Sequence, residues 1–490
     1  MKSLVGGMLA LMAAGAVYAQ GAWLPSGDNR LRNDVTLLAD EGVIRVPVSS
    51  WPIPIDDIAR ALARVDVESI KEPGLQNALL RVQSRVLDVA VHQSGVRDVT
   101  LTAGRPGLLR SYEELGREEA EARIRTGAST GQWSTNLALT VVSSPADGKR
   151  IRFDGSDLTL RAGNWLISAN SFDRWYGPGR DGSLILSGNA RPMIGVSIDR
   201  ALSIPFPIPL LHWLGPWRFQ AYAATMEGHR PDVDRPVFMA MRATFKPLQI
   251  LELGLSRSMQ FCGKDRPCDV ETFGRVLLGQ DNAGIRGLAS ENEPGNQMAG
   301  FDARLVSPFS SLPFALFAQL IGEDSSSTTI PEKYLAIFGL EGWGMLDGGS
   351  VLRARIEYSD TTCSYGNNAY PDCAYDQGIF FAGYRFRGRG IGHTTDSDSE
   401  MFAAGLGWTL PGGDELRLDA RRAHLDRFGA PDENHSIVAG FNRYYSLEAA
   451  WRTRVMGEEV ALKLGAERIE PNGAASRNRA YGFLSWQRRL

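Results

Sequence analysis

Arginine side chains at alternate positions are the groups in this sequence best suited to binding chemistry. A guanidinium group is planar and permanently charged, so it can pair with both oxygens of a carboxylate. Tyrosines add aromatic faces and hydroxyl groups within one nearby segment. The residues concerned are Arg353, Arg355, Arg385, Arg387, Tyr365, Tyr370 and Tyr375.

These arginines have two interpretations, and the sequence leaves both open. In the first, they face water together with the tyrosines and bind a hydroxylated ligand that carries carboxylates. In the second, they pair with Glu357, Asp419 and similar groups and merely fill the interior of the fold.

The four cysteines form two close pairs, Cys262 with Cys268 and Cys363 with Cys373. Neither pair has the C-x-x-C spacing, and no histidine lies between its members, which disfavours a metal site. In an exported protein, such pairs close short loops by disulfides. We therefore predict two disulfides and no metal centre.

Catalytic motifs give little support for an enzyme. The sequence has no G-x-S-x-G elbow, and its six histidines form no H-E-x-x-H helix. Gly177-Pro178-Gly179-Arg180 lacks the Lys-Ser/Thr of a phosphate loop, and Asp396, Asp398 and Glu400 lack the spacing of a calcium loop. We predict no catalytic residues and no cofactor, although a hydrolase that assembles its residues from separate strands stays open.

Charge and composition narrow the class of protein. Lysine and arginine total 53 against 56 aspartates and glutamates, so no global field favours nucleic acid. The sequence contains 53 glycines among 490 residues, a larger share than the ~7% usual for glycine, which favours turns over long helices. No run of about 18 apolar residues free of charge and proline occurs, which argues against a transmembrane helix.

The first part of the chain predicts export followed by helices. Residues 1–19 combine Lys2, an apolar stretch and small residues before position 20, which is typical of a signal peptide. Residues 20–95 contain two apolar stripes with helical spacing, which predict a periplasmic helical segment. The stripes are Ile55, Ile58, Leu62 and Val65, and then Leu75, Leu79, Val82, Val86 and Val89.

Strands with a two-residue apolar period dominate residues 96–490. Their length of about ten residues, with Gly, Pro, Asn and Asp between them, is the signature of a transmembrane β-barrel. Aromatic residues near strand ends suit the two membrane interfaces. Examples of the outward-facing sets are Leu352, Ala354, Ile356 and Tyr358; Phe380, Ala382, Tyr384 and Phe386; Leu416 and Leu418; and Trp165, Trp175, Trp217, Trp408 and Trp486 as the interfacial tryptophans.

A bilayer explains why such strands must close into a ring, because any open edge in hydrocarbon leaves backbone amides unpaired at several kcal/mol each. The charged alternate face, such as Arg353, Arg355 and Glu357, requires water on the inner side. We therefore predict an all-β outer-membrane barrel of antiparallel strands, with no edge that requires a partner and hence a monomer.

The order of several motifs resembles the Wzi-type capsule-assembly family. The signature begins with Gly163-Asn164-Trp165 and continues through Asp173, Arg174, Trp175, Tyr176, Gly177, Pro178 and Gly179 to the stretch 184–192. Further matches follow in order over residues 251–257, 296–302, 322–324, 357–361, 383–385 and 390–393. The resemblance covers essentially the whole mature chain.

This resemblance implies about eighteen strands, with a small helical bundle at the periplasmic end and extracellular loops over the opening. It further implies a lectin-like protein without catalysis, whose partners are capsular or extracellular polysaccharide, outer-membrane lipid and, during insertion, the barrel-assembly machinery. On this basis the arginines and tyrosines named first become candidate polysaccharide-binding residues. A porin or uptake channel, and a barrel-embedded hydrolase, remain the alternatives.

Overall fold

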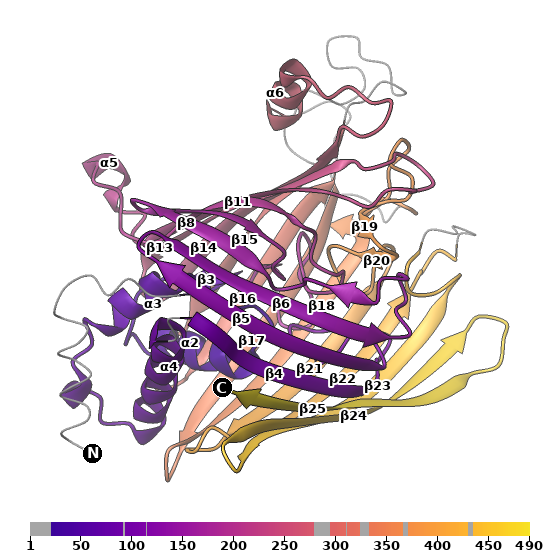
Figure 1. Cartoon of the computed structure of the whole chain (residues 1–490). Coiled ribbons are helices and arrows are strands. Elements are labelled where there is room, and N and C mark those ends of the chain that lie inside the picture. The colour runs from indigo at the N-terminus through magenta and orange to yellow at the C-terminus, as the bar shows by residue number, and fades with distance from the viewer. Residues whose placement is uncertain are drawn as a thin grey trace.

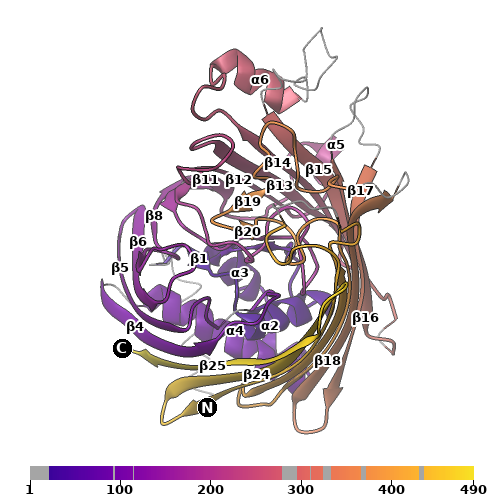
Figure 2. The same cartoon turned by 90° about the vertical axis from the view of Figure 1, so that its right-hand side faces the viewer.

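A computed structural model describes residues 21–91, 94–113, 115–278, 295–309, 311–323, 333–365, 371–429 and 435–490. The predicted signal peptide and Tyr370 lie outside these residues. The described chain forms a closed barrel around a group of helices and inward-folded loops (Figures 1 and 2). Because β7 and β8 both pair with β6, the described strands make an 18-strand antiparallel barrel, which confirms the predicted fold class.

Consecutive barrel strands pair along the chain, and β25 pairs with β4 to close the ring through Trp486 opposite Leu101. The strands are β4 (Ser94–Arg105), β5 (Ala120–Thr130), β6 (Trp133–Ser143), β7 (Ile151–Arg152), β8 (Asp157–Ala162), β9 (Trp165–Asn170), β11 (Gly195–Arg200), β12 (Trp217–Thr225), β13 (Val237–Leu248), β14 (Leu251–Phe261), β15 (Gly295–Val306), β16 (Phe314–Glu323), β17 (Lys333–Leu346), β18 (Ser350–Tyr365), β21 (Glu400–Thr409), β22 (Glu415–Leu425), β23 (Asn442–Val455), β24 (Glu458–Pro471) and β25 (Arg477–Arg489).

The two faces of the barrel wall follow the predicted two-residue period. On β22, Leu416 and Leu418 are 43% and 53% exposed, whereas the alternate residues Arg417 and Asp419 are buried in the interior. The same pattern repeats on β18, where Ile356 faces outward. A continuous ring of exposed aliphatic and aromatic side chains therefore surrounds a polar lumen, as a lipid-facing belt requires.

The helices pack at one end of the barrel (Figure 1). They are α2 (Asn29–Asp40), α3 (Ile55–Leu62), the 3-10 helix η1 (Val67–Ser69) and α4 (Pro73–Val91). The predicted stripes of α3 and α4 form one apolar core with α2 and with the barrel residues Val306, Ala315, Trp343 and Val351. Among the described residues, no helix is both long and apolar enough to span a bilayer.

Helix α2 was not predicted from the sequence. Its start is set by Asp28, whose side chain accepts a hydrogen bond from the Leu31 N–H at 3.1 Å, a standard N-cap. Two strand pairs connect this region to the lumen: β1 (Trp23–Leu24) with β3 (Ile53–Pro54), and β2 (Ser50–Trp51) with β10 (Trp175–Tyr176).

Two predictions about strands are wrong. The stretch from Phe380 to Phe386 is no barrel strand: only β19 (Arg385–Phe386) is extended, and it pairs with β20 (Arg389–Gly390) in a small hairpin of its own. Trp175 is no interfacial residue, because it is 1% exposed inside the barrel. Alternation of apolar residues marks any strand or loop buried on one side, so it did not distinguish a wall strand from a segment inside the lumen.

Two further short helices lie among the described residues, α5 (Pro209–His212) and α6 (Val270–Leu278).

Candidate functional site

The signature segment 173–179 lies inside the barrel and contacts the N-terminal helices. Strand β10 pairs with β2, and the Trp175 indole N–H donates to the Gly179 carbonyl at 2.9 Å. Arg32 of α2 donates to the carbonyls of Pro178 and Gly179, both at 2.9 Å. Burial, reinforced by the charge of Arg180, lowers the pKa of Arg32 to about 9. The segment therefore connects the helices to the lumen.

A first cluster of buried ion pairs joins this interior to the wall. Glu341 on β17 accepts from Arg180 at 3.0 Å and from Arg304 at 3.1 Å, and Arg353 lies 3.3 Å away. Arg304 also binds Asp40 at the end of α2. Glu341 on the wall thus pairs with three guanidinium groups, and one of them, that of Arg304, also binds helix α2.

A second cluster lies farther along the lumen. Asp181, next to the signature segment, accepts from Arg355 at 3.0 Å and from Arg421 at 2.8 Å. Asp419 binds Arg355 and also accepts from Arg417 at 2.7 Å. Buried charges are stable only when paired in this way, so these contacts keep the inner loop against β18 and β22.

The segment 371–399 folds into the barrel beyond these clusters. Arg385 donates to Asp396 at 2.8 Å and to Asp376 at 2.6 Å, while Tyr375 stacks on Tyr384 with ring centroids 5.7 Å apart. His393 is fully buried, and this burial lowers its pKa to about 4. A Cβ at Gly182 would lie 2.0 Å from the His393 Nε2, so this nitrogen has no room for a substrate.

The structure does not bring the predicted binding residues together on one surface. Arg353, Arg355 and Arg385 lie in the buried ion pairs described above, as in the second interpretation of the sequence. Tyr375 is 1% exposed, and its hydroxyl donates to the Leu184 carbonyl at 2.7 Å.

Arg387 and Tyr365 are the candidates that keep accessible surface. Arg387 is partly exposed and lies 3.5 Å from Asp147 and over the Phe386 ring. Tyr365 ends β18, with its ring edge-on to Phe338. Strand β18 begins at the helical end, where Val351 packs in the helical core, so Tyr365 lies at its opposite end. Arg387 lies in the turn between β19 and β20, a hairpin that is also distant from the N-terminal helices (Figure 1).

Both predicted cysteine pairs are joined as disulfides in the structure, Cys262 with Cys268 and Cys363 with Cys373. The first lies between β14 and α6. The second joins the end of β18 to the start of the inward-folded segment. The acidic residues Asp396, Asp398 and Glu400 do not converge, since Asp396 binds Arg385 and Glu400 binds Arg427.

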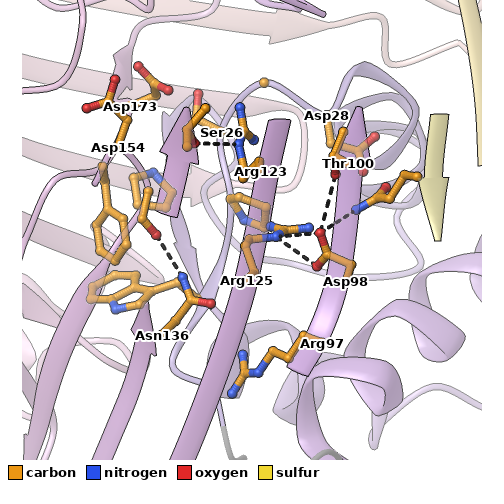
Figure 3. A pocket seen from close by; sticks show the side chains of 18 of the residues that line it. Ser26, Asp28, Arg97, Asp98, Thr100, Arg123, Arg125, Asn136, Asp154 and Asp173 are labelled. Atoms are coloured by element: carbon orange, nitrogen blue, oxygen red, sulfur yellow. Dashed lines mark hydrogen bonds and ion pairs between the residues drawn. The ribbon is translucent and has the colours of Figure 1, made fainter. Parts of the chain in front are cut away.

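A polar cavity of about 360 Å³ lies between the N-terminal segment and the wall formed by β4, β5 and β6. In Figure 3, Arg123 and Arg125 project into it from β5 beside Asp98 and Thr100 of β4. Arg125 donates to Asp98 at 2.8 Å, whereas the Nε and Nη2 atoms of Arg97 have no hydrogen-bond partner among the described residues.

Asp28, the cap of α2, also faces this cavity. Burial alone would raise the pKa of Asp28, but the charges of Arg452, Arg30 and Arg85 outweigh it and lower that pKa to about 2. The cavity therefore carries fixed charges of both signs, which can bind water or the hydroxyl groups of a small ligand. The cavity was not predicted from the sequence, although the alternation in Ala122-Arg123-Ile124-Arg125 indicates inward-facing arginines.

Comparisons with known proteins agree with this architecture. The family model of the capsule assembly protein Wzi matches residues 97–480. An uncharacterized 55.8 kDa protein in the cps region of Klebsiella pneumoniae is 32% identical over 342 residues, covering 69% of this chain and 66% of that relative, just under two thirds of its length. A solved structure from Escherichia coli is described as Wzi, an outer membrane protein involved in group 1 capsule assembly and a carbohydrate-binding β-barrel. It superposes with a TM-score of 0.83 at 24% identity, over 96% of this chain and 100% of that one.

Proposed function

Because the chain belongs to the capsule assembly protein Wzi family, we propose that it holds capsular or extracellular polysaccharide at the surface of the cell. It is an outer-membrane protein, and in this role it acts as a non-catalytic, lectin-like anchor. The supporting observation is the filled lumen. Helices, the signature segment and the segment 371–399 occupy the interior and are held there by buried ion pairs. Such a barrel suits attachment at its outer end better than passage through its centre.

The binding residues within this proposal are those that a polymer at the outer end can reach. Arg387 combines a planar cation with partial exposure, and Tyr365 offers an aromatic ring at the end of β18. Guanidinium groups pair with the carboxylates of acidic sugars, while aromatic rings pack on sugar C–H groups. Arg353, Arg355, Arg385 and Tyr375 lie inside the lumen, where they hold the inner segments in place.

Deletion of the gene and measurement of cell-bound and shed polysaccharide test the proposal. We expect total synthesis to stay unchanged while the polymer moves from the cells to the medium. The full-length chain should restore attachment, and the double variant R387A/Y365A should restore it less well. The matched control is R275A, which removes an exposed arginine of α6. An unaltered distribution of polysaccharide in the deletion strain would reject the anchoring role.

A further inference from the structure

Three arginines form a cluster on the outer face of the barrel. Arg422 on β22, Arg443 on β23 and Arg468 on β24 are all exposed. Each has the outward parity of its strand, as Leu418 does on β22. The first residue of β22, Glu415, accepts a hydrogen bond from α2, so Arg422 lies toward the opposite, extracellular end.

Strand register places this cluster directly above a shallow groove in the lipid-facing belt. Arg422 is opposite Tyr445, which is opposite Arg468 on the next strand. Arg443 lies two residues farther from the helices on β23, opposite Glu470 of β24. One step toward the helices lies a row of small side chains around Leu447, and the groove there has a volume of about 560 Å³. This row is Ala420, Leu447, Ala466 and Ala480.

The protein neutralises the charges of this cluster only in part. In the part of the chain that the structure describes, Arg422 and Arg443 form no ion pair, and Arg468 pairs only with Glu470 at 2.7 Å, in an exposed position. By contrast, the inward-facing Arg417 and Arg421 of the same sheet bind carboxylates. The arginine cluster can therefore bind an anion from outside the barrel.

We propose that this groove binds the lipid A moiety of lipopolysaccharide in the outer leaflet. An acyl chain lies on the alanines beside Leu447, and a phosphate group binds the guanidinium groups above. Phosphates form strong charge-assisted hydrogen bonds with arginine, and clusters of arginines near a membrane surface attract anionic head groups. The position at the extracellular edge of the belt selects lipid A over inner-leaflet phospholipid. The proposal requires an outer-membrane barrel but does not depend on polysaccharide anchoring.

Native mass spectrometry of the full-length protein in detergent, titrated with bisphosphorylated lipid A, tests this site. The variant R422Q/R443Q/R468Q removes the charges, and A466W fills the groove without changing charge. We expect the triple variant to weaken lipid A binding about tenfold or more, because it removes the charge-assisted hydrogen bonds to the phosphate. We expect A466W to weaken binding as well, because the indole occupies the place of the acyl chain. The shift in electrophoretic mobility on heating verifies that each barrel has folded.

The matched control R64Q/R454Q/R488Q removes three exposed arginines near the opposite end and should bind lipid A as the unmodified protein does. Dephosphorylated lipid A and phosphatidylglycerol should both bind more weakly than bisphosphorylated lipid A. Equal binding by the triple variant and the unmodified protein would overturn the proposal. So would equal retention of phosphatidylglycerol and lipid A. Should the triple variant fail to fold, R422Q and R443Q are compared singly under the same criteria.

Discussion

Asp398 holds a carboxyl group where its negative charge is disfavoured. Its side chain is buried in the segment 371–399, and its Oδ2 accepts the Asp372 N–H at 2.9 Å. Burial raises the pKa of Asp398 to about 7, and the charges of Asp372, Asp376 and Asp426 add to this shift. The folded segment therefore binds a proton that the unfolded segment releases near its ordinary pKa of 3.8.

This raised pKa predicts that the segment loses stability as pH rises. A group whose pKa is higher in the folded than in the unfolded state stabilises the folded state fully at a pH below its unfolded pKa. This stabilisation is lost as the pH rises to the folded pKa, here between about pH 4 and 7. Allowing for solvent screening, we expect a loss of about 1–2 kcal/mol. Amide-exchange protection factors around Asp398 should be lower at pH 8 than at pH 5. D398N should remove this difference, whereas D265N, at an exposed loop position, should leave it. Equal protection at both pH values in the unmodified protein would contradict the prediction.

At the level of elements, the strands of the barrel wall could be predicted from the sequence. Each wall strand faces lipid on one side and water or polar groups on the other, so hydrophobicity alternates cleanly, as on β22. Helices α3 and α4 were equally predictable, because their apolar stripes form a common core.

Helix α2 was not predicted, although Leu31, Val35 and Leu38 form a short apolar stripe at helical spacing and lie in the common core. Arg32 donates to backbone carbonyls, Asp34 pairs with Arg81 of α4, and Asp40 pairs with Arg304 of the wall. These charged residues are buried beside the apolar stripe, so the helix lacks the exposed polar face that makes an amphipathic pattern easy to recognise. The sequence could not decide between burial and exposure of Arg353 and Arg355, because Asp40 and Asp181, which approach them from inside the barrel, are distant in sequence.

The disulfide between Cys363 and Cys373 predicts how the inward-folded segment is held. It joins the end of wall strand β18 to the start of that segment, so its loss frees one end of the segment from the wall. C363A/C373A should increase cleavage within residues 371–399 in limited proteolysis and reduce attached polysaccharide, while the barrel stays folded. C262A/C268A should change cleavage only near α6. Identical cleavage of the two variants within 371–399 would argue against this role.

For the molecule as a whole, α2 is one of the elements that fill the lumen, and buried ion pairs attach it to the wall. Asp40 is buried at the end of α2, where it binds Arg304 of β15 and lies 3.8 Å from Arg353 of β18. Asp34 on the same helix pairs instead with Arg81 at 2.7 Å, within the helical group. Asp40 therefore attaches α2 to the wall, whereas Asp34 attaches α2 to α4.

This difference yields a test of the closed barrel against the porin alternative. In planar bilayers, the unmodified protein should conduct far less than an open barrel of the same strand number, because helices and inner segments fill its lumen. D40A leaves Glu341 as the remaining carboxylate partner of the buried Arg304, so the packing of α2 against the wall loses less than the ~3–5 kcal/mol of a fully unpaired charge. The variant should raise the frequency of open-channel events severalfold. D34A removes the same residue type but keeps the link to the wall, so it should raise that frequency much less. Porin-like conductance of the unmodified protein would instead show that the interior admits solutes, and would favour uptake over anchoring.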